Sequence, residues 1–122
     1  MEIESKHFKA IELRCKCPNC RQQKAHQITP DALGRLEKLR DRVNRPIALT
    51  SAYRCGMHPE EAKKAQAGQH NKGTAFDIAV SDGAQRMEIA RLAMELGFNG
   101  IGVAKSFVHV DCRNSTPVMW TY

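Results

Sequence analysis

The sequence predicts one domain that mixes helices with strands, and three observations support this. The 122 residues suffice for one hydrophobic core and are too few for two ordinary domains. Leucines recur at helical spacing between Thr29 and Asn44. Farther along the chain, the segments TAFDIAV and FVHVD alternate side chains between two faces, as half-buried strands do. We therefore predict a single domain over residues 1–122.

Two helices are predicted from their ends as well as from their spacing. The first follows Thr29, whose hydroxyl can cap the helix, and Pro30 needs no amide partner in a first turn. The second covers Gly83 to Leu96, where Asp82 begins a capping box and Gly97 is a typical C-terminal residue. Both carry an apolar stripe, so we expect both to pack against the core.

Strands are predicted between and after these helices. PIALTSAY, from Pro46 to Tyr53, has the length and β-propensity of a strand, and another begins at Gly100. The end of the chain, Pro117 to Tyr122, is predicted to be a final strand or a cover whose aromatic residues form a pocket wall. The polar segment from Met57 to Gln69 is predicted to be a short exposed helix within a long loop.

The charge and hydropathy of the chain favour some partners over others. A formal net charge of +6 favours polyanionic surroundings such as nucleic acid, lipid headgroups or an anionic cell wall. Lysines and arginines are dispersed, and one Trp, two Tyr and four Phe offer few stacking platforms, so we do not expect a nucleic-acid partner. No apolar run approaches the roughly 18 residues that cross a bilayer, so no membrane insertion is expected. We expect a monomer.

The five cysteines allow two interpretations. Cys15, Cys17 and Cys20 form the pattern C-x-C-x-x-C, whose thiols can bind a structural zinc or pair with other cysteines. A zinc knuckle needs a fourth ligand, which would come from Cys55, Cys112 or His26. Structural thiols or a disulfide are the favoured interpretation, and a second zinc site is the alternative.

Two segments carry the residue types of a hydrolytic metal site. GQHNKGTAFD supplies His70 and Asp77, and FVHVDCR supplies His109 and Asp111. The two imidazoles and the Asp77 carboxylate leave a fourth tetrahedral position for water, which distinguishes a catalytic zinc site from a closed structural one. Zinc in such a site lowers the pKa of the water toward about 7.

Two further residues have predicted catalytic roles. His109 and Asp111 lie two residues apart, so on a strand they project from the same face. Asp111 is then a candidate general base that takes a proton from the water and passes it to the leaving amine. Arg54 ends the segment TSAYR, and beside a metal site its guanidinium can hold a substrate carboxylate or stabilise an oxyanion. In isolation, Arg54 would be interpreted as a solvated surface charge.

These motifs resemble those of the zinc D-alanyl-D-alanine carboxypeptidase-like peptidases, a family that cuts the stem peptides of bacterial peptidoglycan. Residues 68–77 match the family motif S-x-H-x-x-G-x-A-x-D at every fixed place except the first, where Gly68 replaces serine. T-S-A-Y-R is similar to the S-x-Y-R segment of the family, and F-V-H-V-D to the H-x-D ending of its smaller phage and bacterial members. The C-x-C pattern and Cys55 also look like those members.

The resemblance implies an α+β fold, in which a small antiparallel sheet carries the metal and helices pack against it. It implies that Arg54 faces the substrate. Neither Ser106 nor Phe107 supplies the Glu or His that acts as base in some branches of the family, which leaves Asp111 as the candidate base. The resemblance also implies zinc as the cofactor, with three ligands, His70, Asp77 and His109.

The leading hypothesis is a zinc peptidase that hydrolyses D-Ala-containing stem peptides or cross-links of peptidoglycan, as a carboxypeptidase or an endopeptidase. The N-terminus lacks the apolar region of a secretory signal, so we expect synthesis in the cytoplasm. Action on the cell wall would follow release during phage lysis, as for a phage or prophage endolysin, or delivery as a virion component. The alternative is a catalytically weak or inactive peptidoglycan-binding module of the same fold. A third hypothesis is a nucleic-acid adaptor built on zinc-bound cysteines.

Overall fold

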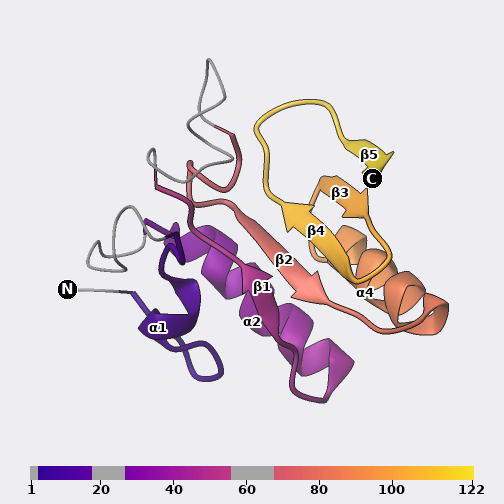
Figure 1. Ribbon diagram of the computed structural model, residues 1–122, viewed down its shortest axis with the longest axis horizontal. Helices are drawn as coiled ribbons and strands as arrows, with labels where there is room; N and C mark the ends of the chain where they lie inside the picture. Colours follow the sequence, from indigo (N-terminus) through magenta and orange to yellow (C-terminus); the bar gives the residue numbers. More distant parts are fainter. Residues whose placement is uncertain (1–2, 18–26, 56–67) are drawn as a thin grey trace.

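A five-stranded sheet lies at the centre of the computed structural model, which describes residues 3–17, 27–55 and 68–122 (Figure 1). The strands are β1 (Leu49–Ser51), β2 (Ala75–Ala79), β3 (Gly100–Val103), β4 (Phe107–Asp111) and β5 (Val118–Thr121). The described helices are α1 (Ala10–Leu13), α2 (Pro30–Val43) and α4 (Gly83–Glu95). The strand order in the sheet is β1-β2-β4-β3-β5. The predicted α+β class is therefore confirmed.

The sheet is mixed, because three of its strand pairs are antiparallel and the pair at one edge is parallel. β1 pairs with β2, β2 with β4 and β4 with β3 in antiparallel fashion, whereas β5 runs parallel to β3. The direction of β5 follows from where the chain leaves β4, since Asp111 at the end of β4 pairs with Gly100 at the start of β3. The connection crosses β3 at that same end, and the amide of Val118 donates to the carbonyl of Asn99. The expected small antiparallel sheet is thus correct except at this edge.

Helices α2 and α4 cover one face of the sheet, as Figure 1 shows. The apolar residues of β2 and β4 on that face, Phe76, Ile78, Val108 and Val110, are fully buried in one core with the leucines of α2. The other face carries the alternate residues of the same strands. The strand pairing therefore separates a core face from a face available for chemistry.

The predicted N-terminal caps of both helices are confirmed, but the capping box predicted at Asp82 is only half formed. The Thr29 hydroxyl accepts a hydrogen bond from the amide of Ala32, and Pro30 occupies the first turn of α2. The Asp82 carboxylate accepts from the amide of Gln85 at the start of α4, but the Gln85 side chain bonds to Ser81 rather than back to Asp82. Each cap satisfies an amide that the helix itself leaves without a partner.

Two other sequence predictions differ in outcome. The strand predicted over Pro46 to Tyr53 is shorter and covers Leu49 to Ser51, and its pairing with β2 shifts register between these two residues. The helix predicted between Met57 and Gln69 falls almost wholly outside the described residues. Within the described ranges, no helix is both long enough and apolar enough to cross a membrane.

A tight turn at residues 69–73 leads into β2, and Gly73 fixes its shape. Gly73 has a φ of 78°, a conformation that side-chain-bearing residues seldom adopt. Its carbonyl accepts from the amide of Thr29, and a Cβ at this position would collide with the backbone carbonyl of Gln27. The turn is therefore held against the segment that precedes α2.

Gly73→Ala is expected to lower the free energy of unfolding by at least about 1–3 kcal/mol, from backbone strain alone. Gly34→Ala is the matched control, since Gly34 lies inside α2 with nothing near its missing Cβ. The control should gain about 0.5–1 kcal/mol, because alanine favours a helix interior more than glycine does. Urea denaturation of both variants measures the two effects, and equal stability of Gly73→Ala and the wild type would contradict this account.

Candidate metal centre

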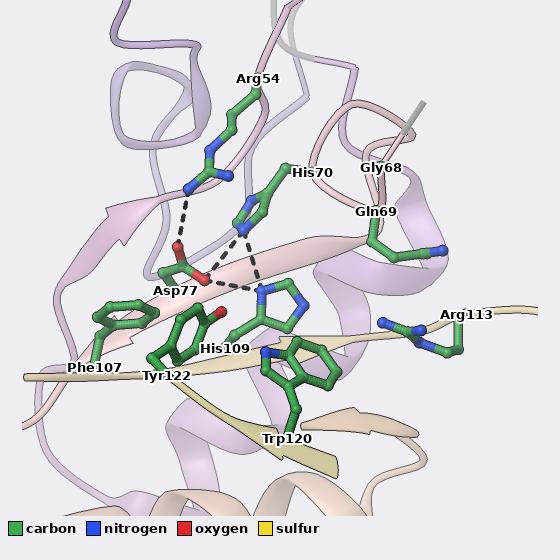
Figure 2. Close-up of a pocket in the computed structure, with 10 residues that line it drawn as sticks. All are labelled: Arg54, Gly68, Gln69, His70, Asp77, Phe107, His109, Arg113, Trp120 and Tyr122. Carbon is green, nitrogen blue, oxygen red and sulfur yellow. Dashed lines mark hydrogen bonds and ion pairs between the residues drawn. The ribbon is translucent and has the colours of Figure 1, made fainter. Parts of the chain in front are cut away.

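Three predicted metal ligands converge on the face of the sheet opposite the helices. Asp77 on β2 and His109 on β4 are direct partners across the antiparallel pair, so their side chains project side by side. His70 comes from the turn that precedes β2. Figure 2 shows the three side chains pointing toward one another, and each residue is no more than 5% exposed.

The three ligand atoms are nearly equidistant. His70 Nε2 lies 3.1 Å from Asp77 Oδ1, His109 Nδ1 lies 3.0 Å from the same oxygen, and the two nitrogens are 3.2 Å apart. Ligands of a tetrahedral zinc with bonds of about 2.0–2.1 Å would lie about 3.3 Å apart. The spacing therefore fits a small divalent cation with little adjustment.

Hydrogen bonds at the far side of each imidazole determine which nitrogen can bind a metal. His70 Nδ1 donates to the carbonyl oxygen of Ala52 at 2.6 Å, and His109 Nε2 donates to Asp111 Oδ2 at 2.6 Å. In a neutral ring the other nitrogen then carries a lone pair. Two such lone pairs and the Asp77 oxygen face one another, an arrangement that a cation stabilises.

The electrostatics of the site favour positive charge at this point. Burial opposes ionisation of Asp77, but His109 and His70, which donate hydrogen bonds to it when their rings are protonated, outweigh burial and hold the pKa of Asp77 well below its ordinary value. Burial likewise disfavours protonation of His109, but hydrogen bonds to Asp111 and Asp77 outweigh it and raise its pKa. Asp77 is therefore ionised at neutral pH and available to a metal ion.

Arg54 lies beside the three ligands, after the end of β1. Its Nη2 lies 3.3 Å from Asp77 Oδ2, and its Nε donates to the Ser51 hydroxyl at 3.1 Å. The two oxygens of Asp77 therefore have different neighbours, the histidines on one side and the guanidinium on the other (Figure 2). The substrate-facing role of Arg54 stays a prediction.

Asp111 lies behind His109 and is completely buried. Both of its oxygens accept from the Arg113 guanidinium, at 2.9 and 2.7 Å, and Oδ2 also accepts from His109. Burial raises the pKa of Asp111, but the bonds from His109 and Arg113 outweigh it and the net pKa is lowered. A carboxylate with both oxygens engaged is better placed to orient the imidazole than to accept a proton from water. Its predicted role as general base stays a prediction that this geometry does not favour.

A cavity of about 720 Å³ adjoins the three ligands. Its wall combines the guanidinium groups of Arg54 and Arg113 with three aromatic side chains, Phe107, Trp120 and Tyr122 (Figure 2). Asp111 is not among the residues that line it. The cavity therefore offers positive charge and apolar surface next to the metal ligands.

Trp120 is held in this wall by neighbours on both sides. Its ring centroid is 5.0 Å from that of His109, and the Arg113 guanidinium carbon lies 5.2 Å from the ring. The indole fits because Gly102, its partner across β3 and β5, has no side chain. A Cβ at Gly102 would come within 2.6 Å of indole atoms. The prediction that the terminal segment supplies a strand and part of a pocket wall is thus confirmed.

Phe107 and Arg113 were not predicted as parts of the site, whereas Tyr122 belongs to the terminal segment that was predicted to form a pocket wall. The first two continue the alternation of β4, since residues 107, 109, 111 and 113 are two apart and share a side of the chain. That periodicity could have found them. Tyr122 reaches the cavity only because β5 returns alongside β3, a pairing with no signal in the sequence.

Comparison with known proteins agrees with this site. A family model described as Peptidase M15 matches residues 6–111, which is most of the chain. The chain belongs to the peptidase M15 family. The M15 peptidases are metallopeptidases, so the resemblance to zinc D-alanyl-D-alanine carboxypeptidase-like enzymes is confirmed at the level of the family. A search of curated proteins found no match for this M15 chain.

Gly102→Ala tests the packing of the cavity wall. The added methyl group should displace Trp120, the only tryptophan of the chain, and change its fluorescence emission. We expect a red shift, because the displaced indole is more exposed to water. Gly34→Ala should leave the emission unchanged, and an unchanged spectrum in Gly102→Ala as well would contradict the described packing.

Proposed function

We propose that this M15 family member is a zinc peptidase that hydrolyses D-Ala-containing peptide bonds in the stem peptides or cross-links of bacterial peptidoglycan. The observation that carries the proposal is the convergence of His70 Nε2, Asp77 Oδ1 and His109 Nδ1 beside a cavity. Three protein ligands of this kind leave a tetrahedral cation with one position for water or substrate. A structural zinc would instead have all four positions filled by the protein.

The donor set suits zinc, with His70, Asp77 and His109 as its ligands. Two imidazoles and one carboxylate are borderline and hard donors, which zinc accepts readily. Bound zinc supplies Lewis acidity and lowers the pKa of water toward about 7. The chain supplies the orientation of the ligands, through the carbonyl of Ala52 behind one imidazole and the Asp111 carboxylate behind the other.

The charges on the cavity wall suit a peptide that carries free carboxylates. Arg54 and Arg113 both line the cavity, and a guanidinium can bind a carboxylate through two parallel hydrogen bonds. Stem peptides of peptidoglycan end in a carboxylate and carry methyl side chains, which Phe107, Trp120 and Tyr122 could contact. We propose that Arg54 orients the substrate carboxylate or stabilises the developing oxyanion.

We propose further that Asp111 acts on His109 instead of on water. Its carboxylate joins the imidazole to Arg113, and such partners behind a ligand raise its basicity and fix its ring. The space for this carboxylate comes from Gly100, where a Cβ would collide with it. Asp111 is then a positioning residue for the metal ligand.

Asp111→Asn distinguishes the two roles of this residue. A positioning role predicts a zinc dissociation constant raised by about 10- to 100-fold, with turnover close to the wild type once zinc is saturating. A general base predicts unchanged zinc affinity and a kcat lowered by about 10²- to 10⁴-fold. Competition with a chromophoric chelator measures the affinity. Asp82→Asn is the matched control, because asparagine also caps a helix and Asp82 lies at the start of α4.

The biological setting is proposed from the likeness of FVHVD to the smaller phage and bacterial members of the family. We propose an endolysin-type enzyme that acts as a monomer on the cell wall, after release during phage lysis or as a virion component. A net charge of +6 would favour association with an anionic wall polymer.

The activity is tested by incubating purified peptidoglycan with the zinc-loaded protein and identifying the released or newly terminated peptides by mass spectrometry. We expect cleavage next to D-Ala, abolished in His70→Ala and His109→Ala and retained in Gly34→Ala. A protein that sediments with peptidoglycan yet yields no new peptide ends would instead support the inactive binding module. Cleavage that survives in both histidine variants would refute the metal site.

A further inference from the structure

A second cluster of potential metal ligands lies apart from the site described above. Cys15 and Cys17 follow α1, and Cys55 follows β1 beyond Arg54. The three are buried, at 0%, 3% and 7% exposure, and they form a small cluster separate from the main core. The sulfur of Cys55 lies 3.6 Å from that of Cys15 and 3.5 Å from that of Cys17.

These distances fit thiolates around one metal ion better than they fit a disulfide. Sulfur atoms bound to a tetrahedral zinc at about 2.3 Å lie about 3.8 Å apart, whereas a disulfide needs about 2.0 Å. A disulfide would also engage two of the three sulfurs and leave the third beside it. All three sulfur atoms lie within 4.8 Å of one another, so a single ion can contact them together.

The structure also selects among the partners that the sequence allowed. Cys55 joins Cys15 and Cys17, whereas Cys112 packs at the margin of the main hydrophobic core. Cys20 and His26, the other potential ligands, lie outside the described residues. The cluster therefore brings together residues 38 and 40 positions apart in the chain, which a C-x-C motif alone does not predict.

We propose that Cys15, Cys17 and Cys55 bind a second zinc ion, with a structural role. Thiolates are soft ligands that favour zinc over magnesium or calcium, and structural zinc sites commonly combine three cysteines with a fourth protein ligand. Among the described residues, the three cysteines supply three of these four ligands. Each thiol releases its proton to solvent as the ion binds. The proposal concerns metal binding alone and does not depend on the peptidase activity.

Because of where the cysteine cluster lies, a zinc ion bound there would also affect the candidate catalytic centre. The amide of Tyr53 donates to the carbonyl of Leu13, so the N-terminal segment already pairs with the chain that leads to Cys55. The segment that leads to Cys55 also holds His70. The carbonyl of Ala52 accepts a hydrogen bond from His70 Nδ1, and the amide of Arg54 donates to the backbone carbonyl of His70. A metal ion at the cysteines would fix the segment that orients one ligand of the candidate catalytic centre.

Counting zinc per chain by mass spectrometry of the intact protein, purified in the presence of a reductant, tests the proposal. We expect two zinc ions in the wild type and one in each of Cys15→Ser, Cys17→Ser and Cys55→Ser. His70→Ala should also retain one, held by the cysteines. Cys112→Ser is the matched control and should retain two. If Cys15→Ser and Cys55→Ser bind as many zinc ions per chain as the wild type, the proposal is overturned.

A second measurement covers the case in which a cysteine variant does not fold. Adding Co²⁺ to the metal-free wild-type protein should produce the intense thiolate-to-cobalt charge-transfer absorption that imidazole and carboxylate ligands do not give. The same absorption should appear in His70→Ala and in Cys112→Ser. Its absence from the wild type, or a disulfide among the three cysteines after purification with reductant, would overturn the proposal.

Discussion

The pairing of Asp77 with His109 across β2 and β4 is the constraint on which the rest of the site depends. Side chains alternate along each strand, so a slip of one residue would turn one of these groups into the core. The register that brings them together also buries Phe76, Ile78, Val108 and Val110 beneath the helices. Hydrophobic burial therefore stabilises the register that the metal centre requires, and no further interaction is needed to align the two strands.

The third ligand comes from outside the sheet, and its position depends on the backbone of neighbouring loops. His70 is held by carbonyl and amide groups of the segment that follows β1, and its turn is closed by Gly73 against the segment before α2. Backbone groups of this kind have no side-chain freedom to lose. The imidazole is consequently oriented before any ion binds, which lowers the entropic cost of metal binding.

Much of this arrangement could be predicted from the sequence, and the reasons differ between its parts. The caps at Thr29 and Asp82 are local interactions, so the ends of α2 and α4 could be read from a few neighbouring residues. The alternation of FVHVD predicted which side chains share a face, and the spacing of GQHNKGTAFD identified His70 and Asp77 as candidate ligands. These are properties of short segments.

Most of the unpredicted parts depend on contacts between distant segments. The parallel direction of β5 follows from the end of the sheet at which the chain leaves β4. The sequence does not indicate this direction, so the residues that the terminal aromatic side chains contact could not be predicted. The ion pair of Asp111 with Arg113 changes which role suits that carboxylate, and residue type alone did not indicate it. Cys55 could be joined to Cys15 and Cys17 only once the fold had been determined.

The central claim is that His70 Nε2, Asp77 Oδ1 and His109 Nδ1 bind one zinc ion, and anomalous diffraction at the zinc absorption edge tests it most directly. Crystals of the zinc-loaded protein should give a peak at about 2.0–2.2 Å from all three atoms. A crystal that contains zinc but has no peak between these atoms, or one in which His109 binds through Nε2 after losing its contact with Asp111, would contradict the account.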